Sequence, residues 1–218
     1  IIHDCSTDEG REAGLKAAVD AVEAGRLVVL PTDTVYGLGC DAFSSRGYAG
    51  LLRVKGSSGS RSGPSPVMIA HAAALTGIAR GVTTEVRSLA EGFWPGGLTL
   101  VVPAQTTLRW DLNPTLAVRV PLHPVALEVL EKVGPMAVVA ASAPAGNPPL
   151  TCADAEEQLG EDVAVYLDAG AVGGSGTAST VIDATQERLQ VLRLGGLALE
   201  ELRRVVPDLL GPDGDEAH

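Results

Sequence analysis

A short segment at residues 31–39, PTDTVYGLG, concentrates groups that can hold a ligand. It carries two threonine hydroxyls, one carboxylate and one phenol, and its two glycines would let a bound molecule approach the backbone closely. The apolar run before it, residues 27–30, predicts a short strand, which would place these polar groups at a strand end. The same residue types also suit a capped turn, so the segment alone leaves both interpretations open.

Three cations and one hydroxyl elsewhere in the chain are further candidates. Lys55 precedes a Gly/Ser-rich stretch, residues 56–65, in which Arg61 is the basic residue. Arg119 lies among apolar residues of an expected strand, where a buried cation needs a partner. Ser179 begins another expected strand. A solvated lysine at a helix end and a serine bonded to nearby backbone are the simpler interpretations of Lys55 and Ser179.

The composition excludes several classes of protein. The chain has 218 residues, of which 45% are hydrophobic, and this suits one domain with a buried core. Asp and Glu number 27 against 16 Lys and Arg, and the net charge of -11 argues against a general nucleic-acid binder and a polybasic membrane-surface protein. The three cysteines lack metal-ligand spacing, so neither a disulfide framework nor a metal site is predicted.

No targeting or membrane segment is expected. Residues 1–10, IIHDCSTDEG, have neither the basic start nor the apolar run of a signal peptide. No uncharged apolar run reaches the length that spans a membrane. We therefore expect a cytoplasmic protein with reduced, buried cysteines.

Helix and strand patterns alternate along the chain and must position the candidate groups. Ser6 and Glu9 have the spacing of a capping box, which predicts a helix start there, and residues 32–39 are expected to be a polar, turn-rich strand end. Apolar runs that favour strands lie at 27–30, 67–70, 98–102, 116–120, 136–141, 163–167, 180–182 and 189–192. Helices are expected at 48–55, 84–93, 124–132, 151–159 and 197–206. This order predicts an α/β (α+β) protein with a mixed sheet.

Several motifs together resemble the YrdC-like family of L-threonylcarbamoyladenylate synthases. PTDTVYGLG looks like the signature of that family, and further matches follow in the same order. They are Lys55-Gly56, FWPGGLT at 93–99, AVRVP at 117–121 with His123-Pro124, STVID at 179–183, and Leu192-Arg193. The resemblance covers about residues 12–205 and fits the single-domain members, so residues 1–218 are expected to form one YrdC-like domain.

The resemblance implies a fold and a reaction. The fold is a twisted mixed sheet flanked by helices, with a large concave cavity. The reaction is a nucleotidyl transfer that converts L-threonine, bicarbonate and ATP into threonylcarbamoyl-AMP and pyrophosphate. Other proteins then transfer the threonylcarbamoyl group to adenosine 37 of certain tRNAs. Positioning and charge neutralisation dominate such chemistry, with Mg2+ expected to accompany ATP.

The matched positions imply residue roles. Two cations, Lys55 and Arg119, are expected to be catalytic. L-threonine is assigned to Thr32, Tyr36, Arg119 and Ser179, with the guanidinium fork on the threonine carboxylate. ATP is assigned to Lys55, Thr115, Ser142 and Arg193. No side chain is assigned to a metal ion.

The chain departs from the family pattern after Lys55. The family has Lys-x-Arg, whereas Ser57 stands at the arginine position here, in a longer loop. We expect residues 56–65 to form a lid over the ATP phosphates, with Arg61 supplying the missing cation. The alternative is a solvated insertion without a role.

A second departure lies near Ser142. Pro144 stands where the family has Asn, and Asn147 lies close by in a shifted register. Proline offers neither the side-chain amide nor a backbone N–H, which would weaken nucleotide binding. Leu194 also replaces the usual proline after Arg193.

Three functions therefore stay open. The first is the synthase itself, which makes the tRNA modification precursor and supplies downstream tRNA threonylcarbamoyl-transfer proteins. The second is a catalytically weakened or non-catalytic YrdC-like protein that binds nucleotide or RNA, although the net charge of -11 disfavours direct tRNA binding. The third is adenylation of a different carbamate. No membrane partner is expected.

Overall fold

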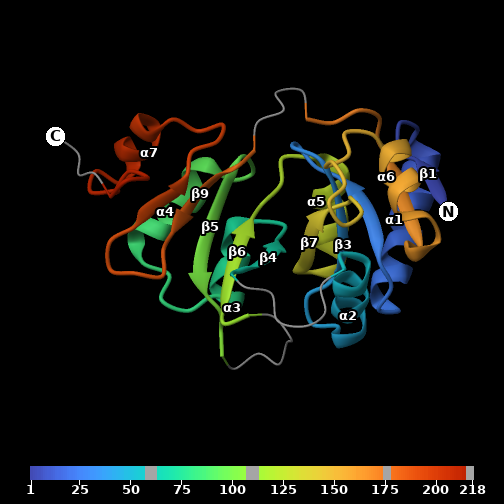
Figure 1. The fold of residues 1–218 in the computed structure, drawn as a ribbon, viewed down its shortest axis with the longest axis horizontal. Coiled ribbons are helices and arrows are strands. Elements are labelled where there is room, and N and C mark those ends of the chain that lie inside the picture. The colour runs from blue at the N-terminus through green and yellow to red at the C-terminus, as the bar shows by residue number, and fades with distance from the viewer. Residues whose placement is uncertain (57–62, 107–112, 174–177, 215–218) are drawn as a thin grey trace.

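Ten strands form one mixed sheet in the computed structural model, which describes residues 1–56, 63–106, 113–173 and 178–214 (Figure 1). Their order across the sheet is β1-β8-β2-β3-β7-β4-β6-β5-β9-β10, with four parallel pairs among otherwise antiparallel neighbours. The strands are Ile2–Asp4 (β1), Val28–Pro31 (β2), Tyr36–Asp41 (β3), Ser65–Met68 (β4), Leu98–Pro103 (β5), Thr115–Arg119 (β6), Met136–Ala140 (β7), Val165–Asp168 (β8), Thr180–Asp183 (β9) and Gln190–Arg193 (β10). The predicted fold class is thus confirmed.

Helices cover both faces of this sheet. One hydrophobic cluster joins α1 and α5 to alternate residues of β2, β7 and β8, while a second joins α2, α4, α6 and α7 to the intervening strand residues. Figure 1 shows α4 and α7 at the opposite end of the sheet from α1 and α6. The helices are Asp8–Glu23 (α1), Ser45–Val54 (α2), Leu75–Ile78 (α3), Thr84–Phe93 (α4), Pro124–Val133 (α5), Cys152–Leu159 (α6) and Leu199–Val205 (α7), with 3-10 turns at Ala72–Ala74 (η1) and Gly160–Asp162 (η2).

The first helix begins one residue later than the sequence predicts. Thr7, not Ser6, is the N-cap, because its hydroxyl accepts the backbone N–H of Gly10 at 3.1 Å. The backbone N–H of Ser6 instead donates to the Asp4 carboxylate at 2.9 Å, which completes a turn before the helix. The predicted capping box at Ser6 and Glu9 is therefore wrong.

The prediction that residues 32–39 form only a turn is wrong for their second half. Tyr36 starts β3, which pairs antiparallel with both β2 and β7. A Cβ on Gly37 would lie 2.7 Å from Val138, and one on Gly39 would lie 2.9 Å from Met136. The two glycines therefore make room for side chains of β7 rather than for a ligand.

None of the described helices is long and apolar enough to cross a membrane.

Candidate functional site

Arg119, the last residue of β6, is the centre of the first polar cluster. The residue is 7% exposed, and each of its guanidinium nitrogens, Nε, Nη1 and Nη2, donates one hydrogen bond. Nε donates to the carbonyl of Gly96 at 3.0 Å, Nη1 to the hydroxyl of Thr34 at 3.1 Å, and Nη2 to the carboxylate of Asp33. The guanidinium carries five N–H donors, and these partners use three, so two N–H donors have no partner among the described residues.

Thr32 holds the turn that brings Asp33 and Thr34 to Arg119. Its hydroxyl accepts the backbone N–H groups of Thr34 and Val35, each at 3.2 Å, and donates to the carbonyl of Val35 at 2.6 Å. The residue is 1% exposed. Thr32 lies beside the Arg119 cluster, and its hydroxyl is fully engaged in the turn, so its contact with L-threonine stays a prediction.

Tyr36 is also buried, and it fixes a second loop against the same turn. Its hydroxyl donates to the carbonyl of Gly170 at 2.6 Å and accepts the backbone N–H of Ala169 at 3.1 Å. Burial, more than the nearby Asp168, raises the pKa of this phenol. The loop then passes so close to Thr34 that a Cβ on Gly173 would lie 2.2 Å from the Thr34 carbonyl oxygen. Tyr36 thus positions backbone around the cluster.

Ser179 and Arg193 form a second cluster; Ser179 precedes β9, two strands from Arg119 on β6, and Arg193 lies on β10, three strands away. Thr99 of β5 donates to the Ser179 hydroxyl at 2.9 Å, and Arg193 Nη2 donates to the Ser179 carbonyl at 2.9 Å. A Cβ on Gly195 would lie 2.1 Å from the carbonyl oxygen of Ala178, so this tight return of the chain after β10 requires glycine.

The FWPGG turn at 93–97 connects the two clusters. The backbone N–H of Gly96 donates to the Val120 carbonyl at 3.0 Å, and the carbonyl of Gly97 accepts the N–H of Thr180 at 2.9 Å. The carbonyl of Gly96 also holds Arg119. One turn therefore fixes β6, which carries Arg119, relative to β9, which follows Ser179.

Lys55 and Ser142, both predicted to contact ATP, lie together in a third cluster. Lys55 follows the last turn of α2, and its ammonium donates to the Ser142 carbonyl at 2.6 Å, the Ser142 hydroxyl at 3.1 Å and the Ala140 carbonyl at 3.2 Å. These oxygens lie at the end of β7. The lysine is thereby oriented toward the segment that begins at Ser142.

The segment that carries Pro144 has an amide partner outside the predicted site. Gln158 of α6 accepts the backbone N–H of Ala143 at 3.2 Å and donates to the carbonyl of Asn147 at 3.1 Å. A Cβ on Gly56 would lie 3.1 Å from the Pro144 ring, which places the segment beside the start of the loop after Lys55. Gln158 holds the backbone where the family pattern has Asn.

Two predicted ATP contacts are not tied to these clusters. Thr115 lies at the opposite end of β6 from Arg119, about 13 Å away along the strand at the usual rise per residue. Arg61 and Ser57 lie outside the described residues, as does most of the predicted lid. The Arg61 role stays a prediction.

Sequence reasoning missed three side chains that shape the site. Asp33 and Thr34 stand inside the PTDTVYGLG motif but were not assigned a role, and Thr99 stands in FWPGGLT. The sequence did indicate that a buried Arg119 needs a partner, and Asp33 is an acidic residue within the neighbouring candidate motif. No sequence signal identified Thr99, whose contact to Ser179 depends on the pairing of β5 with β9.

His123 adjoins the Arg119 cluster through the backbone. The neighbouring Leu122 donates its backbone N–H to the Asp33 carboxylate at 3.0 Å. The Nδ1 atom of His123 is buried, with no hydrogen-bond partner in the described part of the chain. Burial lowers the pKa of this imidazole, which outweighs the opposite effect of Asp33. The histidine is therefore neutral near neutral pH.

The three cysteines are free and buried, as predicted. Burial raises the pKa of Cys5 to about 11 and those of Cys40 and Cys152 to about 12. Protonated thiols of this kind are inert packing groups. Within residues 1–56, 63–106, 113–173 and 178–214, no group of three His, Cys, Asp or Glu side chains could hold a metal ion.

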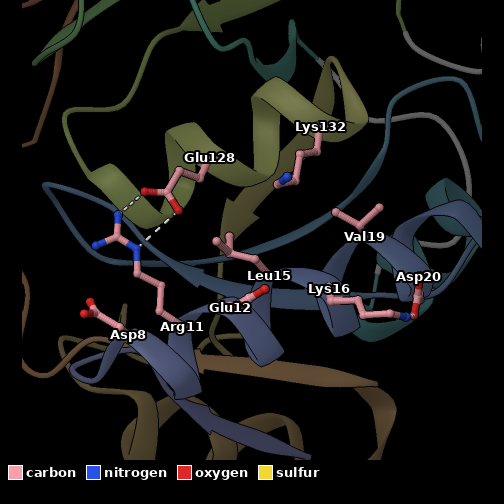
Figure 2. A pocket seen from close by; sticks show the side chains of 9 residues that line it. All are labelled: Asp8, Arg11, Glu12, Leu15, Lys16, Val19, Asp20, Glu128 and Lys132. Carbon is pink, nitrogen blue, oxygen red and sulfur yellow. Dashed lines mark hydrogen bonds and ion pairs between the residues drawn. The ribbon is translucent and has the colours of Figure 1, made fainter.

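A hollow of about 500 Å³ lies elsewhere, between α1 and α5 (Figure 2). Leu15 and Val19 form its apolar part, and Arg11 is paired with Glu128 across it. None of the predicted site residues lines this hollow. The large concave cavity implied at the predicted site stays a prediction.

Three cations, Lys55, Arg119 and Arg193, lie at the ends of a helix or strand around one mixed sheet. The sequence model of the Sua5/YciO/YrdC family, described as "Telomere recombination", matches residues 20–195. The chain belongs to this family.

Curated relatives agree with this membership. A Mycobacterium tuberculosis protein provisionally named threonylcarbamoyl-AMP synthase is 43% identical over 206 residues, covering 93% of this chain and 94% of the relative. The threonylcarbamoyl-AMP synthase of Pyrococcus abyssi is 33% identical over 202 residues, covering 89% of this chain and 58% of the relative.

Solved structures share the fold. P. abyssi Sua5 complexed with L-threonine has a TM-score of 0.84 and 31% identity, covering 94% of this chain and 61% of that one. This chain therefore spans about three fifths of the Pyrococcus protein. Escherichia coli YciO has a TM-score of 0.77 at 22% identity, covering 93% and 97% of the two chains, and supports the fold alone.

Proposed function

We propose that this chain is a threonylcarbamoyl-AMP synthase that converts L-threonine, bicarbonate and ATP into threonylcarbamoyl-AMP and pyrophosphate. The observation that carries the proposal is the Arg119 cluster, a buried guanidinium with two spare donors. It occurs on a fold that binds L-threonine in P. abyssi Sua5. The whole chain, residues 1–218, would act as one domain, in line with the continuous sheet.

The proposed chemistry needs little covalent help from the protein. The threonine amine and bicarbonate form a carbamate and release water. One carbamate oxygen then attacks the α-phosphorus of ATP, the bond to the β-phosphate oxygen breaks, and pyrophosphate leaves. Orientation of the carbamate and neutralisation of phosphate charge are the contributions expected of side chains.

The amino-acid side of the site is built around Arg119. Its two spare N–H donors would receive the threonine carboxylate, while Asp33, Thr34 and the Gly96 carbonyl keep the fork from rotating. Ser179 would contact the substrate across β5. Thr32 and Tyr36 would act by holding the backbone that surrounds the amino acid, since both hydroxyls bond to backbone groups.

The nucleotide side would use Lys55, Ser142 and Arg193. Both cations are held by backbone carbonyls and a serine hydroxyl, and each is placed at the end of a helix or strand. We include Thr115 and Arg61 as nucleotide contacts on the family resemblance alone. Mg2+ would accompany the ATP phosphates and supply charge neutralisation. We further propose a cytoplasmic location, with the product passing to proteins that modify tRNA.

The weakened-activity alternative is favoured by one observation. Pro144 lacks the amide of the family's Asn, and Gln158 contacts only the backbone on either side of it. A reduced affinity for ATP, with threonine binding intact, is what this alternative predicts.

Pyrophosphate release tests the proposal against its rivals. Wild-type protein should release pyrophosphate from ATP only when L-threonine and bicarbonate are both present, and mass spectrometry should detect threonylcarbamoyl-AMP. Release that requires another amino acid or carbamoyl phosphate would identify a different carbamate. The absence of release at saturating ATP, with threonine still bound, would contradict synthase activity and support the non-catalytic alternative.

A further inference from the structure

A hollow of about 550 Å³ lies beside the outer face of α2 and contains none of the residues assigned above. It is enclosed by the turn between α1 and β2, the helix α2, and the connection from η2 to β8. Its lining combines three arginines with two acidic and several small residues, namely Gly25, Arg26, Leu27, Arg46, Ala49, Gly50, Arg53, Glu161, Asp162 and Ala164. We call it the arginine hollow.

The α2 sequence creates this space through its spacing. Arg46 and Arg53 lie two turns apart on one face of α2, so their Cα atoms are about 10 Å apart along the helix axis. Ala49 and Gly50 occupy the same face between them and have almost no side chain to fill the gap. A Cβ added to Gly50 would have its nearest neighbour, Leu27, 3.8 Å away, so Gly50 itself has space around it. Short residues between two long cations leave a recess flanked by guanidinium groups.

The arginine hollow has one more cationic than anionic side chain, and only one of its three arginines is ion-paired within the described residues. Arg53 contacts Asp162 at 3.4 Å, but both side chains are more than half exposed, and such a pair is weak. Arg26 and Arg46 have no ion-pair or hydrogen-bond partner for their side chains in the described part of the chain. Three guanidinium groups therefore face two carboxylates on a protein whose net charge is -11.

The hollow between α1 and α5 shows the contrast (Figure 2). There Arg11 is paired with Glu128 and Lys16 with Asp20, and further acids, Asp8 and Glu12, line the same space. With Lys132, three cations there face four carboxylates. The α1–α5 hollow therefore has one more carboxylate than cations, whereas the arginine hollow has one more cation than carboxylates.

We propose that the arginine hollow is a second anion site, for a small ligand that carries phosphate groups, such as an inorganic oligophosphate or a nucleoside phosphate. Guanidinium forks match phosphate oxygens in pairs, and the volume lies in the range of small-molecule pockets. A small ligand fits better than an RNA strand, because an acidic surface repels an extended polyanion. Lys55, which follows α2, bonds to the end of β7 and does not line the arginine hollow, so the hollow is distinct from the proposed ATP site.

Arginine side-chain NMR tests the site directly. Inorganic pyrophosphate is titrated into 15N-labelled protein while the Nε–Hε signals are followed. The signals of Arg26, Arg46 and Arg53 should shift together with one dissociation constant. Arg80 is the internal control, because it is an exposed arginine that lines none of the hollows described here. Shifts no larger than that of Arg80 would overturn the proposal.

Variants that should weaken pyrophosphate binding and one that should strengthen it provide a sharper test. Arg46→Gln and Arg26→Gln should each weaken pyrophosphate binding at this site by roughly tenfold, the loss expected for a charge-assisted hydrogen bond, whereas Arg80→Gln should leave it unchanged. Asp162→Asn should strengthen binding, because it frees Arg53. Weaker binding in Asp162→Asn would contradict the proposed geometry.

Repeating the titration in Arg193→Gln protein distinguishes binding at the arginine hollow from binding at the proposed catalytic site. The shifts of Arg26 and Arg46 should persist there even if activity is lost, so failure of the arginine hollow and failure of the synthase proposal give different results. A single-stranded RNA oligonucleotide is titrated in parallel at matched salt. If RNA shifts these signals and pyrophosphate does not, the assignment to a small phosphate ligand is wrong.

Discussion

Arg119 and Arg193 each end a strand, but Arg119 is buried beside a carboxylate and Arg193 is exposed without one among the described residues. Arg119 is 7% exposed and faces the carboxylate of Asp33, which balances its charge inside the protein. Arg193 is exposed on the edge strand β10, and its hydrogen bonds go to the carbonyl and hydroxyl of Ser179. Within the described residues it has no carboxylate partner.

The difference teaches how one sheet can serve two anionic groups. A buried cation needs a permanent partner, so the Arg119 fork is fixed in one orientation before any substrate arrives. An exposed cation held only by neutral oxygens keeps its charge available for an incoming anion. This division suits a carboxylate that must be oriented and phosphates that must be neutralised.

Removal of the Arg119 side chain should have the largest effect. Arg119→Ala leaves Asp33 partly buried without its cation, which should lower the free energy of unfolding by about 3–5 kcal/mol. Threonine binding should be lost as well. Urea unfolding and calorimetry measure the two effects. The double variant Arg119→Ala/Asp33→Asn should regain stability but not threonine affinity; regained threonine affinity would remove Arg119 from the site.

Arg193→Gln should affect ATP without affecting the fold. The lost charge should raise the KM for ATP about tenfold, or about 1.4 kcal/mol, with the urea midpoint unchanged because the side chain is exposed. Steady-state kinetics with each substrate varied in turn provides the measurement. A raised KM for threonine at an unchanged KM for ATP would reverse the proposed division between the two arginines.

Tyr36→Phe should have a smaller effect. It removes one buried hydroxyl from two backbone partners, Gly170 and Ala169, at a cost of about 1 kcal/mol in stability. Because the loop from 169 to 173 borders Thr34, the KM for threonine should rise a few-fold while kcat changes little. Tyr166→Phe is a matched control, since that hydroxyl bonds to the carbonyl of Gly160, away from the Arg119 cluster. Equal kinetic effects of both variants would argue against a positioning role.

The smallest effect is expected for His123→Asn, which should change how the free energy of unfolding depends on pH. Its folded-state pKa lies below 6.5, so the unfolded chain takes up a proton first, and stability is lost as the pH falls below about 6.5. Wild-type protein should therefore lose more stability between pH 7 and pH 5 than His123→Asn. Denaturant midpoints at the two pH values provide the measurement. Parallel losses in both proteins would mean that His123 contributes nothing to acid sensitivity.

The predictable part of the fold follows from periodic apolar patterns. Helix α4 has the expected bounds, and strands β9 and β10 lie within one residue of the expected runs. Strand β3 escaped detection because its glycines and the hydroxyl-rich turn before it look like a loop, although tertiary pairing with β7 makes it a central strand. Thr7 and not Ser6 caps α1, since the Ser6 backbone N–H donates to the Asp4 carboxylate in a turn before the helix.

The site cations stay a prediction, and the sequence did not identify the partners that the structure gives them. A guanidinium among apolar residues indicated that Arg119 needed a counterion, yet Asp33 lies 86 residues earlier and only the fold brings it there. Lys55 and Ser142 are hydrogen-bonded to each other, while their role in binding ATP stays a prediction. Backbone acceptors such as the Gly96 carbonyl carry no residue-specific signal, so no sequence pattern could reveal them.

The most direct test of this account compares Arg119→Lys with Arg193→Lys, two variants that keep the charge and remove the fork. L-threonine and a non-hydrolysable ATP analogue are titrated into each by calorimetry. The account predicts that Arg119→Lys loses threonine affinity roughly tenfold while binding the ATP analogue normally. Arg193→Lys should bind threonine normally and keep most of its ATP affinity, since a lysine still supplies the charge. If Arg119→Lys weakens the ATP analogue as much as it weakens threonine, the separate roles of the two arginines are wrong.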